Sequence, residues 1–311
     1  MNRIRISKAP SLAELTSIGL GGKALAEVLV EDAPALERLP EVLRRLGGRP
    51  VMLGRGSNIL AREGELPLLL VRLGRGFTAA EPRFLGLEEG GAAGVFAVPA
   101  AMPLPALVAK LCRGGWSGLQ GLAGIPGSVG GAVAMNAGSF GMDMKGCLKG
   151  VSFFSARRGF FTRQAAELEI GYRHFAVPGL AEDSDDFWLV TGALLNCRKQ
   201  ALEAPAARPA ALAAELEEFR RRKARTQPVG ERSAGCVFKN PALAPAGRLL
   251  EEAGFKGRAL GGMAFSGRHA NFLVNTGSGR SAEAFALIEA ARAAVKTRSG
   301  VELELEVRVW E

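Results

Sequence analysis

The sequence predicts an α+β fold that is divided into more than one domain, and three observations favour it. The 311 residues are 48% apolar and 23% charged, which is typical of a globular protein with a substantial core. Before residue 200, short apolar runs with strand spacing alternate with helix-length segments. An alanine- and proline-rich stretch at 201–210 then reads as a linker, and a region richer in helix follows it.

The first region reads as a β-α-β-β unit. Residues 25–30 are expected to form a strand, and 33–46 a helix that ends at Gly47-Gly48 despite Pro40. Two more strands are expected at 50–54 and 66–73. Because a helix joins the first strand to the second, a crossover connection is expected between them.

The second region reads as an antiparallel sheet that carries helices. A helix at 103–113 begins with prolines in its first turn and ends at Gly114-Gly115. The strand-like runs lie at 84–90, 94–100, 151–156, 159–165 and 187–198, with a turn at 157–159 between the third and the fourth.

The third region is predicted to hold helices at 211–225, 246–253 and 281–298, with Ser281 as the N-cap of the last one. The chain closes with a predicted strand at 301–310, in which apolar and polar residues alternate. Leu303, Leu305 and Val307 are expected to face the core, and Glu302, Glu304, Glu306 and Arg308 the other side.

Composition narrows the range of functions. The four cysteines are scattered without a CxxC pair and there are only two histidines, so we expect no metal site and read the thiols as free, which fits a cytoplasmic protein. We find no signal peptide and no apolar run long enough to span a membrane. The net charge of +9 is compatible with nucleic acid or with small anionic ligands. Dispersed basic residues and few stacking aromatics favour the second.

The most unusual stretch of the chain is GLAGIPGSVGGAVAMNAGSFG at 121–141. It is rich in glycine, has no charged residue and is not of low complexity. A backbone of this kind either turns tightly or approaches something closely. The stretch is therefore either the wall of a site for a phosphate-bearing cofactor or an ordinary glycine-rich loop, and its composition alone does not separate the two.

A second glycine-rich loop, GRGSN at 54–58, follows a predicted buried strand. It has Ile59 where a dinucleotide GxGxxG motif would have its third glycine, and it lacks the lysine of a P-loop. Two uncharged loops of this kind in one chain suggest one extended ligand with a central diphosphate, such as FAD, bound by main-chain amides.

Three further positions could carry chemistry, and each also has an ordinary interpretation. Arg173 follows the only tyrosine of the chain, Tyr172, and an isolated arginine is usually a solvated charge. Cys236 follows two small residues and precedes Lys239, but most cysteines are buried and inert. Glu306 lies on the polar side of the last predicted strand, where a carboxylate normally faces solvent.

Taken together, these motifs resemble those of the UDP-N-acetylenolpyruvoylglucosamine reductase family, also called UDP-N-acetylmuramate dehydrogenases. The resemblance covers nearly the whole chain and keeps the family's order. Its motifs are TSIGLGG (16–22), GRGSN (54–58), GLQGLAGIPGSVGGAVAMNAG (118–138), YR (172–173), RTQP (225–228), SAGCVFKNP (233–241), AGRLLEEAG (246–254), HANFLVN (269–275) and LELEVR (303–308). The chain length favours the family's shorter subtype.

The resemblance implies an FAD-binding fold of the vanillyl-alcohol-oxidase/p-cresol-methylhydroxylase (PCMH) type, made of two subdomains, plus a C-terminal α+β substrate-binding domain. The corresponding division is 1–75, 76–203 and 204–311, with the last strand returning Glu306 to the active site. In this family NADPH reduces non-covalently bound FAD, which then passes hydride to the enolpyruvyl group of UDP-N-acetylglucosamine enolpyruvate. The product, UDP-N-acetylmuramate, is a peptidoglycan precursor.

The resemblance also implies roles for residues. Arg173 would stabilise the charge that develops on the substrate, and Cys236 would donate the proton where many relatives have serine. Glu306 matches the family's catalytic glutamate, with a carboxyl pKa raised by burial. Substrate-binding candidates are Tyr172, Arg225, Lys239 and Asn240, and the cofactor-binding candidates are Gly54, Arg55, Gly56, Ser57, Asn58, Gly124, Ile125, Pro126, Gly127, Ser128, Gly130, Gly131, Asn136, Ala137 and Gly138.

Two alternatives follow from the same residues. One is another FAD-dependent oxidoreductase of this fold, acting on hydroxy acids or lactones. Such enzymes often attach FAD covalently, but no histidine precedes His174, which disfavours a histidyl link. The other is a basic, non-enzymatic nucleotide-binding or nucleic-acid-binding protein. We expect a monomeric enzyme that neither binds nucleic acid nor inserts into a membrane.

Overall fold

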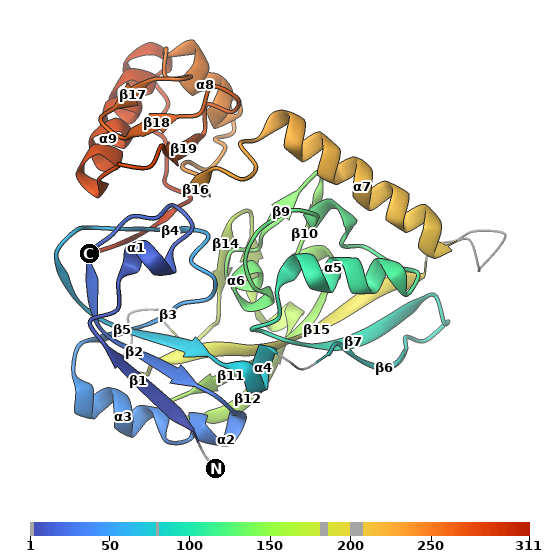
Figure 1. Cartoon of the computed structure of the whole chain (residues 1–311). Helices are drawn as coiled ribbons and strands as arrows, with labels where there is room; N and C mark the ends of the chain where they lie inside the picture. The colour runs from blue at the N-terminus through green and yellow to red at the C-terminus, as the bar shows by residue number, and fades with distance from the viewer. Residues whose placement is uncertain (1–2, 79–80, 181–185, 200–207) are drawn as a thin grey trace. The chain divides into compact units, whose positions relative to one another are not determined.

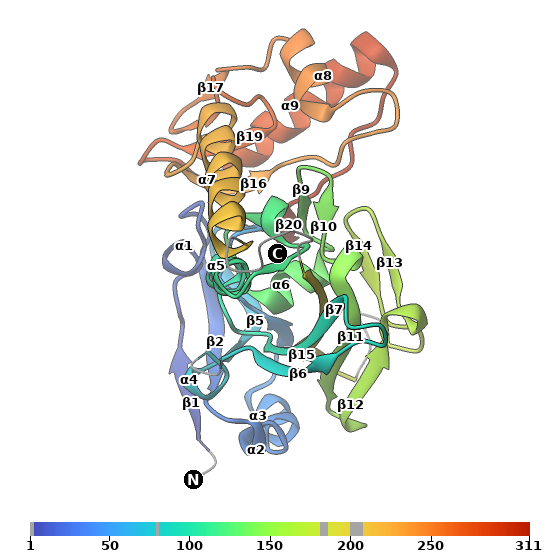
Figure 2. The ribbon, with the colours of Figure 1, turned by 90° about the vertical axis from the view of Figure 1, so that its right-hand side faces the viewer.

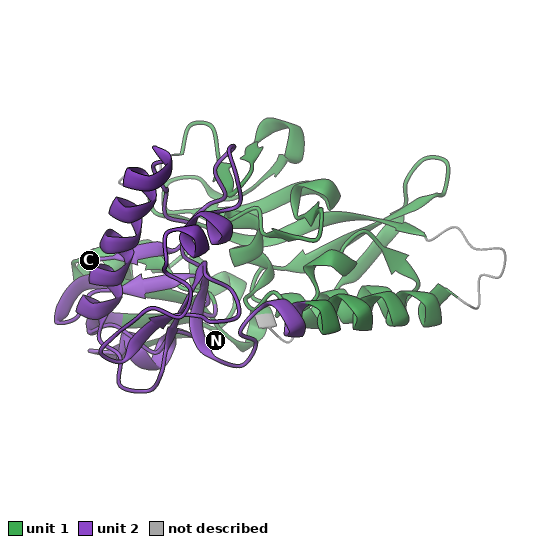
Figure 3. Cartoon of the chain, turned by 90° about the horizontal axis from the view of Figure 1, so that it is seen from above, with its two compact units in different colours: residues 1–6, 27–54, 69–222 green, residues 7–26, 55–68, 223–311 purple. Residues whose placement is uncertain are grey.

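The computed structural model describes residues 3–78, 81–180, 186–199 and 208–311. Its contacts divide the chain into two units, each assembled from separate segments of the sequence (Figure 3). Unit 1 comprises Met1–Ile6, Glu27–Gly54 and Leu69–Arg222, and unit 2 comprises Ser7–Ala26, Arg55–Leu68 and Lys223–Glu311. The sequence-based division into three functional domains stays a prediction.

The main sheet of unit 1 is antiparallel, as the sequence predicted (Figure 1). Its strands lie in the order β12-β11-β15-β7-β6, and the short β8 also pairs with β15. Their bounds are β6 Arg83–Leu87, β7 Ala93–Pro99, β8 Trp116–Ser117, β11 Leu148–Ser155, β12 Gly159–Gln164 and β15 Trp188–Lys199. Strand β11 has a neighbour on each edge and is buried along most of its length.

Two helices of unit 1 matter for the site: α5 (Leu104–Arg113) and α6 (Val129–Ala134). The apolar face of α5 is buried, and α6 packs on β15 and β7. Around α6 lie the short elements η1 (Gln120–Leu122), β9 (Gly138–Ser139), β10 (Met142–Asp143), η2 (Lys145–Cys147), η3 (Ala165–Glu167), β13 (Glu169–Gly171) and β14 (His174–Ala176). The long helix α7 (Arg208–Thr226), labelled in Figure 2, follows the main sheet in sequence. The boundary between the units falls near its end, after Arg222.

The N-terminal part of the chain forms a four-stranded sheet in the order β1-β2-β5-β3. These strands are β1 (Ile4–Lys8), β2 (Lys23–Val30), β5 (Glu65–Leu73) and β3 (Arg49–Met52). In β2 every second side chain is buried, which is the pattern of a strand with one covered face. The predicted crossover connects β2 to β3. These two strands are not neighbours in the sheet, because β5 lies between them. The short elements α1 (Leu12–Leu15), β4 (Ile59–Ala61) and α4 (Arg75–Thr78) complete this region.

The helix predicted at 33–46 is two helices, α2 (Ala33–Leu36) and α3 (Leu39–Leu46). Asp32 caps the first by accepting a hydrogen bond from the Ala35 amide at 3.0 Å. Pro40 lies in the first turn of the second, where its missing N–H costs nothing, so it starts a helix instead of interrupting one. The predicted end at Gly47 is confirmed.

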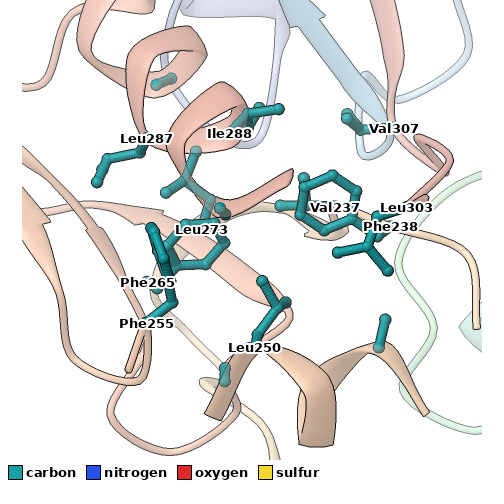
Figure 4. Close-up of a cluster of buried hydrophobic side chains, with 14 of the residues drawn as sticks. Val237, Phe238, Leu250, Phe255, Phe265, Leu273, Leu287, Ile288, Leu303 and Val307 are labelled. Atoms are coloured by element: carbon teal, nitrogen blue, oxygen red, sulfur yellow. The ribbon is translucent and has the colours of Figure 1, made fainter. Parts of the chain in front are cut away.

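Unit 2 packs two helices against an antiparallel sheet of order β16-β19-β18-β17. The elements are β16 (Arg232–Cys236), α8 (Ala246–Glu252), β17 (Ala259–Leu260), β18 (Met263–Phe265), β19 (Phe272–Asn275) and α9 (Ser281–Ser299). Between sheet and helices lies one apolar core, with Phe238, Phe255 and Phe265 among its fully buried side chains (Figure 4). Burial on this scale is the main force that holds the unit together.

Two sequence predictions in this unit were wrong. Ser281 is the first residue of α9 and not its N-cap, because the carboxylate of Glu283 accepts the Arg280 and Gly262 amides and so performs the capping itself. The last strand is β20 (Arg308–Trp310), much shorter than 301–310. Before it, the amides of Glu306 and Val307 both donate to the Val237 carbonyl, which interrupts regular pairing. Leu303 and Val307 are buried as expected, whereas Leu305 is only partly buried.

No helix in the described part of the chain is long and apolar enough to cross a membrane. The same residues contain no cluster of three or more His, Cys, Asp or Glu side chains that could hold a metal ion.

Candidate active site

The glycine-rich stretch of unit 1 contains α6 together with the tight loops before and after it. Gly127 has a φ of +127°, and its carbonyl accepts the Leu104 amide at the start of α5. Gly130 lies against β7's end: a Cβ there would be 2.9 Å from the Cβ of Ala100. The bulk of any side chain would therefore push the loop away from the sheet, so the glycines set the path of the main chain.

The two glycine-rich loops meet in unit 1. A Cβ at Gly54 would lie 2.8 Å from the hydroxyl oxygen of Ser128, which caps α6 by accepting the Gly131 amide. A side chain at Gly54 would clash with the Ser128 hydroxyl, and neither residue is charged. An uncharged, side-chain-free approach of this kind is compatible with a cofactor such as FAD, whose diphosphate main-chain groups can bind. The amides of Val129 and Gly130 donate to Met102 and Ala100 carbonyls and belong to the fold.

Arg173 lies at the tip of the β13–β14 hairpin, in the turn that pairs Gly171 with His174. Its backbone is left-handed, with a φ of +50°, which is uncommon for a residue other than glycine. The guanidinium donates to the carbonyls of Asn136 at 3.3 Å and Gly138 at 3.0 Å. The ring of Tyr172 lies 5.2 Å from the guanidinium carbon, and half of Tyr172 is exposed. A fixed cation is thus presented beside the end of the glycine-rich stretch.

In unit 2, Glu306 is tied to the second glycine-rich loop. The side-chain amide of Asn58 donates to the Glu306 carbonyl at 3.1 Å, and the Arg308 amide donates to the Asn58 carbonyl. From there β20 runs parallel to β4. The side chain of Glu306 is half-buried, not fully exposed as a simple alternating strand would have it.

Cys236 and Glu306 lie on neighbouring segments of unit 2. Cys236 ends β16 after Gly235, whose φ is +79°, and the pairing with β19 shifts register at this point. The next residue, Val237, accepts the Glu306 amide at 2.8 Å. The structure therefore brings together two of the three predicted catalytic residues, and Arg173 belongs to unit 1.

The other three cysteines differ from Cys236, which is only partly buried. Burial raises the pKa of the Cys112 thiol to about 11 and that of the Cys197 thiol to about 12. Burial also raises the pKa of the Cys147 thiol. These thiols stay neutral near pH 7 and are structural.

The predicted substrate-binding residues are in mixed surroundings. Lys239 is partly buried, and its ammonium is 3.3 Å from the carboxylate of Glu304. Asn240 accepts the first amide of α8 through its side-chain oxygen, which is a structural bond. Arg225 lies in the last turn of α7.

Sequence reasoning missed the residues that hold these groups in place. Asn271, almost fully buried, accepts the Phe238 amide and donates to the Phe238 carbonyl, so it clamps the strand just after Cys236. Ser17 donates to the Ser233 carbonyl at 2.6 Å on the other side of Cys236. Both lie in motifs that carried the resemblance, and for Asn271 the signal that could have found it is a polar amide between the apolar residues Ala270 and Phe272.

The comparisons with known proteins first define a class. An FAD binding domain family model matches residues 24–157, so the chain is a flavoprotein with the FAD-binding PCMH-type fold. A second model, described as UDP-N-acetylenolpyruvoylglucosamine reductase, C-terminal domain, matches residues 227–310.

Full-length relatives then define the family. UDP-N-acetylenolpyruvoylglucosamine reductase of Nitratidesulfovibrio vulgaris is 47% identical over 98% of both chains, and that of Oleidesulfovibrio alaskensis 48% over 98% of both. The crystal structure of the Thermus caldophilus enzyme covers 100% of both chains with a TM-score of 0.78 at 32% identity. This chain belongs to the UDP-N-acetylenolpyruvoylglucosamine reductase family. The α+β fold class predicted from the sequence, with its C-terminal domain, is confirmed.

Proposed function

We propose that this chain is an NADPH-dependent flavoenzyme that reduces the enolpyruvyl group of UDP-N-acetylglucosamine enolpyruvate. The product is the lactyl ether UDP-N-acetylmuramate, a precursor of peptidoglycan. The observation that carries the proposal is the identity of nearly half of all residues with named reductases over almost the entire length of both chains. The motifs that provide the candidate site lie within this matched length.

Non-covalently bound FAD would supply the redox chemistry, with NADPH as the hydride donor. We assign its binding to the two loops that meet at Gly54 and Ser128, with Arg55, Gly56, Ser57 and Asn58 continuing the first. In the second loop the assigned residues are Gly124, Ile125, Pro126, Gly127, Gly130, Gly131, Ala137 and Gly138. These residues add no charge apart from Arg55, so the main chain would do most of the binding.

The protein's own side chains control charge and protons on the substrate. Hydride addition at the methylene carbon leaves negative charge on the adjacent carbon and its carboxylate. Arg173 stabilises this charge with a permanent cation and a planar fork that matches a carboxylate. The Cys236 thiol donates the proton to the adjacent carbon, and Glu306 assists as a protonated carboxyl group or through a water molecule.

The sugar nucleotide is held by Tyr172, Arg225, Lys239 and Asn240 in this proposal. Lys239 and Arg225 offer cations for the diphosphate, and the exposed ring of Tyr172 offers an apolar face next to Arg173. The partners of this enzyme are thus small molecules, and we propose no binding of nucleic acid and no insertion into a membrane. We place the enzyme in the cytoplasm as a monomer.

A two-step stopped-flow experiment tests the proposal. The purified protein should be yellow, and NADPH should bleach the flavin under anaerobic conditions. Addition of UDP-N-acetylglucosamine enolpyruvate should then restore the oxidised flavin spectrum in a single turnover. Flavin that is reduced by NADPH but not reoxidised by the sugar nucleotide would refute the assignment and would favour another oxidoreductase of the same fold. A colourless protein that binds no FAD would refute both.

A further inference from the structure

A buried asparagine lies behind Arg173. Asn136 follows α6, is 1% exposed and has a left-handed φ of +38°. Its side-chain nitrogen donates to the Gly171 carbonyl at 2.7 Å and to a carboxylate oxygen of Asp143 at 3.1 Å. Its side-chain oxygen accepts the Lys145 amide at 2.9 Å. Its main-chain amide donates to Val133.

We infer that Asn136 is the positioning residue of Arg173, an inference that rests on the role proposed for that arginine. Asn136 contacts the arginine's turn at two places. Its side chain holds the Gly171 carbonyl, where the two-residue turn begins, and its own carbonyl accepts the Arg173 guanidinium at the far end. Asn136 thereby contacts both the start of the turn that carries Arg173 and the guanidinium end of the Arg173 side chain.

The backbone conformations support this assignment. Asn136 and Arg173 both have positive φ, and non-glycine residues keep such conformations only where their surroundings hold them. At Asn136 the conformation turns the chain sharply after α6, with both the main-chain carbonyl and the side chain directed to the hairpin. Asparagine tolerates this region better than most residues, and it alone adds an amide that both donates and accepts here.

Two neighbours extend the same arrangement. The Asp143 carboxylate accepts from Asn136 through one oxygen and from the Gly146 amide through the other. The ammonium of Lys145 donates to the Ile170 carbonyl at 2.9 Å, one residue before Gly171. Segment 136–146 therefore donates hydrogen bonds to two successive carbonyls of β13, and Asn136 makes most of the bonds in this network.

This network also separates Asn136 from the FAD-binding residues among which the sequence prediction placed it. Its amide, carbonyl, side-chain nitrogen and side-chain oxygen each have a protein partner in unit 1. A buried side chain with this set of bonds serves the protein and not the cofactor. Its loss should affect the chemistry on the substrate and leave FAD binding intact.

The test uses the full-length holoenzyme and three substitutions. Asn136→Ala removes the side-chain bonds, and Asn136→Gly removes them while relaxing the left-handed backbone, so a folded variant is available if alanine prevents folding. Ser155→Ala is the matched control: Ser155 is equally buried in unit 1 and bonds Asp186 in a separate network. Flavin reduction by NADPH, reoxidation by UDP-N-acetylglucosamine enolpyruvate and FAD affinity are measured for each.

We expect reoxidation by the sugar nucleotide to slow about 10- to 100-fold in both Asn136 variants, since a small displacement of a charge-stabilising group costs this much. Reduction by NADPH and FAD affinity should stay within about 2-fold of the wild type, as should both half-reactions of Ser155→Ala. Weaker FAD binding, or equal slowing of both half-reactions, would overturn the inference.

A double variant shows whether Asn136 acts through Arg173. In an Arg173→Ala background, Asn136→Gly should slow reoxidation by less than about 2-fold, because the group that it positions is gone. Full additivity of the two losses would overturn the positioning role. If wild-type flavin is not reoxidised by the sugar nucleotide at all, the proposed function itself fails, and this inference falls with it.

Discussion

At the scale of single residues, the four cysteines occupy two kinds of environment. Cys112, Cys147 and Cys197 are at most 3% exposed, and burial raises the pKa of each thiol. Cys236 is partly exposed, on a segment whose neighbours fix its backbone from both sides. Because alkylation requires a thiolate that the reagent can reach, the difference is directly measurable.

We predict that iodoacetamide labels one cysteine in the native protein near pH 7.5 and all four after denaturation. Intact mass and peptide mapping should place the native label on Cys236. The Cys236→Ser variant should take up no label before unfolding. Rapid native labelling at Cys112 or Cys197 would contradict the buried, neutral state assigned to them.

The proton-donor role of Cys236 gives a second prediction. Cys236→Ala should slow reoxidation by the sugar nucleotide about 100-fold or more, the usual contribution of a positioned acid. Cys236→Ser should retain substantial activity, because a hydroxyl can donate the same proton. Flavin bleaching by NADPH should be normal in both variants. Equal losses in both half-reactions of the alanine variant would show that Cys236 supports the fold and not the proton transfer.

The catalytic candidates could be predicted from the sequence, but the residues that hold their segments in place could not. Arg173, Cys236 and Glu306 stand in recognisable motifs, whereas the bonds of Asn136 join it to residues 35 positions away and those of Asn58 to residues 248 positions away. A local pattern contains no information about such partners. This is why the sequence places Asn136 among the cofactor-binding candidates of its loop and indicates no role for Asn271.

At the scale of elements, local signals worked where local physics decides the structure. The burial pattern of β2, the start of α5 and the end of α3 at Gly47 follow from alternation and capping residues. The prediction of a strand at 301–310 was wrong, because hydrogen bonds to Val237 arrange segment 303–307 and its alternation of apolar and polar residues does not. The predicted N-cap of α9 was also wrong, because the Glu283 carboxylate accepts the Arg280 amide and Arg280 is the capping residue.

The contact between α8 and the loop that contains His269 gives a prediction about pH. The His269 ring lies 3.3 Å from where a Cβ of Gly247 would be, and its Nδ1 accepts the Asn271 amide. Burial lowers the pKa of His269; the Lys256 ammonium acts in the same direction and the Glu251 carboxylate against it. The native state therefore binds fewer protons than the unfolded state at mildly acidic pH.

It follows that His269 stabilises the fold fully above about pH 6.5 and that this contribution is lost as pH falls through the lowered native pKa. Urea unfolding of the wild type and His269→Gln should show this between about pH 8 and pH 5. The stability advantage of the wild type should shrink toward acid, because only the wild type must unfavourably protonate a buried ring. An advantage that is constant or grows toward acid would contradict the shift.

At the scale of the whole molecule, the sequence cannot show which distant segments pack together. It predicted contiguous regions, whereas each contact-based unit is built from three separated segments. The parallel pairing of β20 with β4 places the last strand of the chain in the same unit as GRGSN from Arg55 onward. The sequence predicts that both glycine-rich loops bind one ligand, whereas the approach of Gly54 to Ser128 depends on the fold.

The approach of Gly54 to Ser128 leads to a prediction about how FAD changes the stability of the protein. If main-chain groups of the two loops bind the diphosphate, FAD should stabilise the apoprotein, by about 2.7 kcal/mol when it is present at 100 times its Kd. For a chain of 311 residues the melting temperature should then rise by roughly 4 °C. Riboflavin, which has the same ring but no diphosphate, should shift it far less at equal concentration.

Differential scanning fluorimetry of the apoprotein with FAD, riboflavin and ADP separates the contributions of ring and diphosphate. ADP should stabilise the protein measurably, because the main-chain surface at Gly54 and Ser128 is expected to recognise the diphosphate without the flavin. Gly54→Val should reduce the FAD and ADP shifts together, since its side chain would occupy the space beside the Ser128 hydroxyl. Equal shifts from riboflavin and FAD would contradict the prediction, because the diphosphate would then add nothing to the binding.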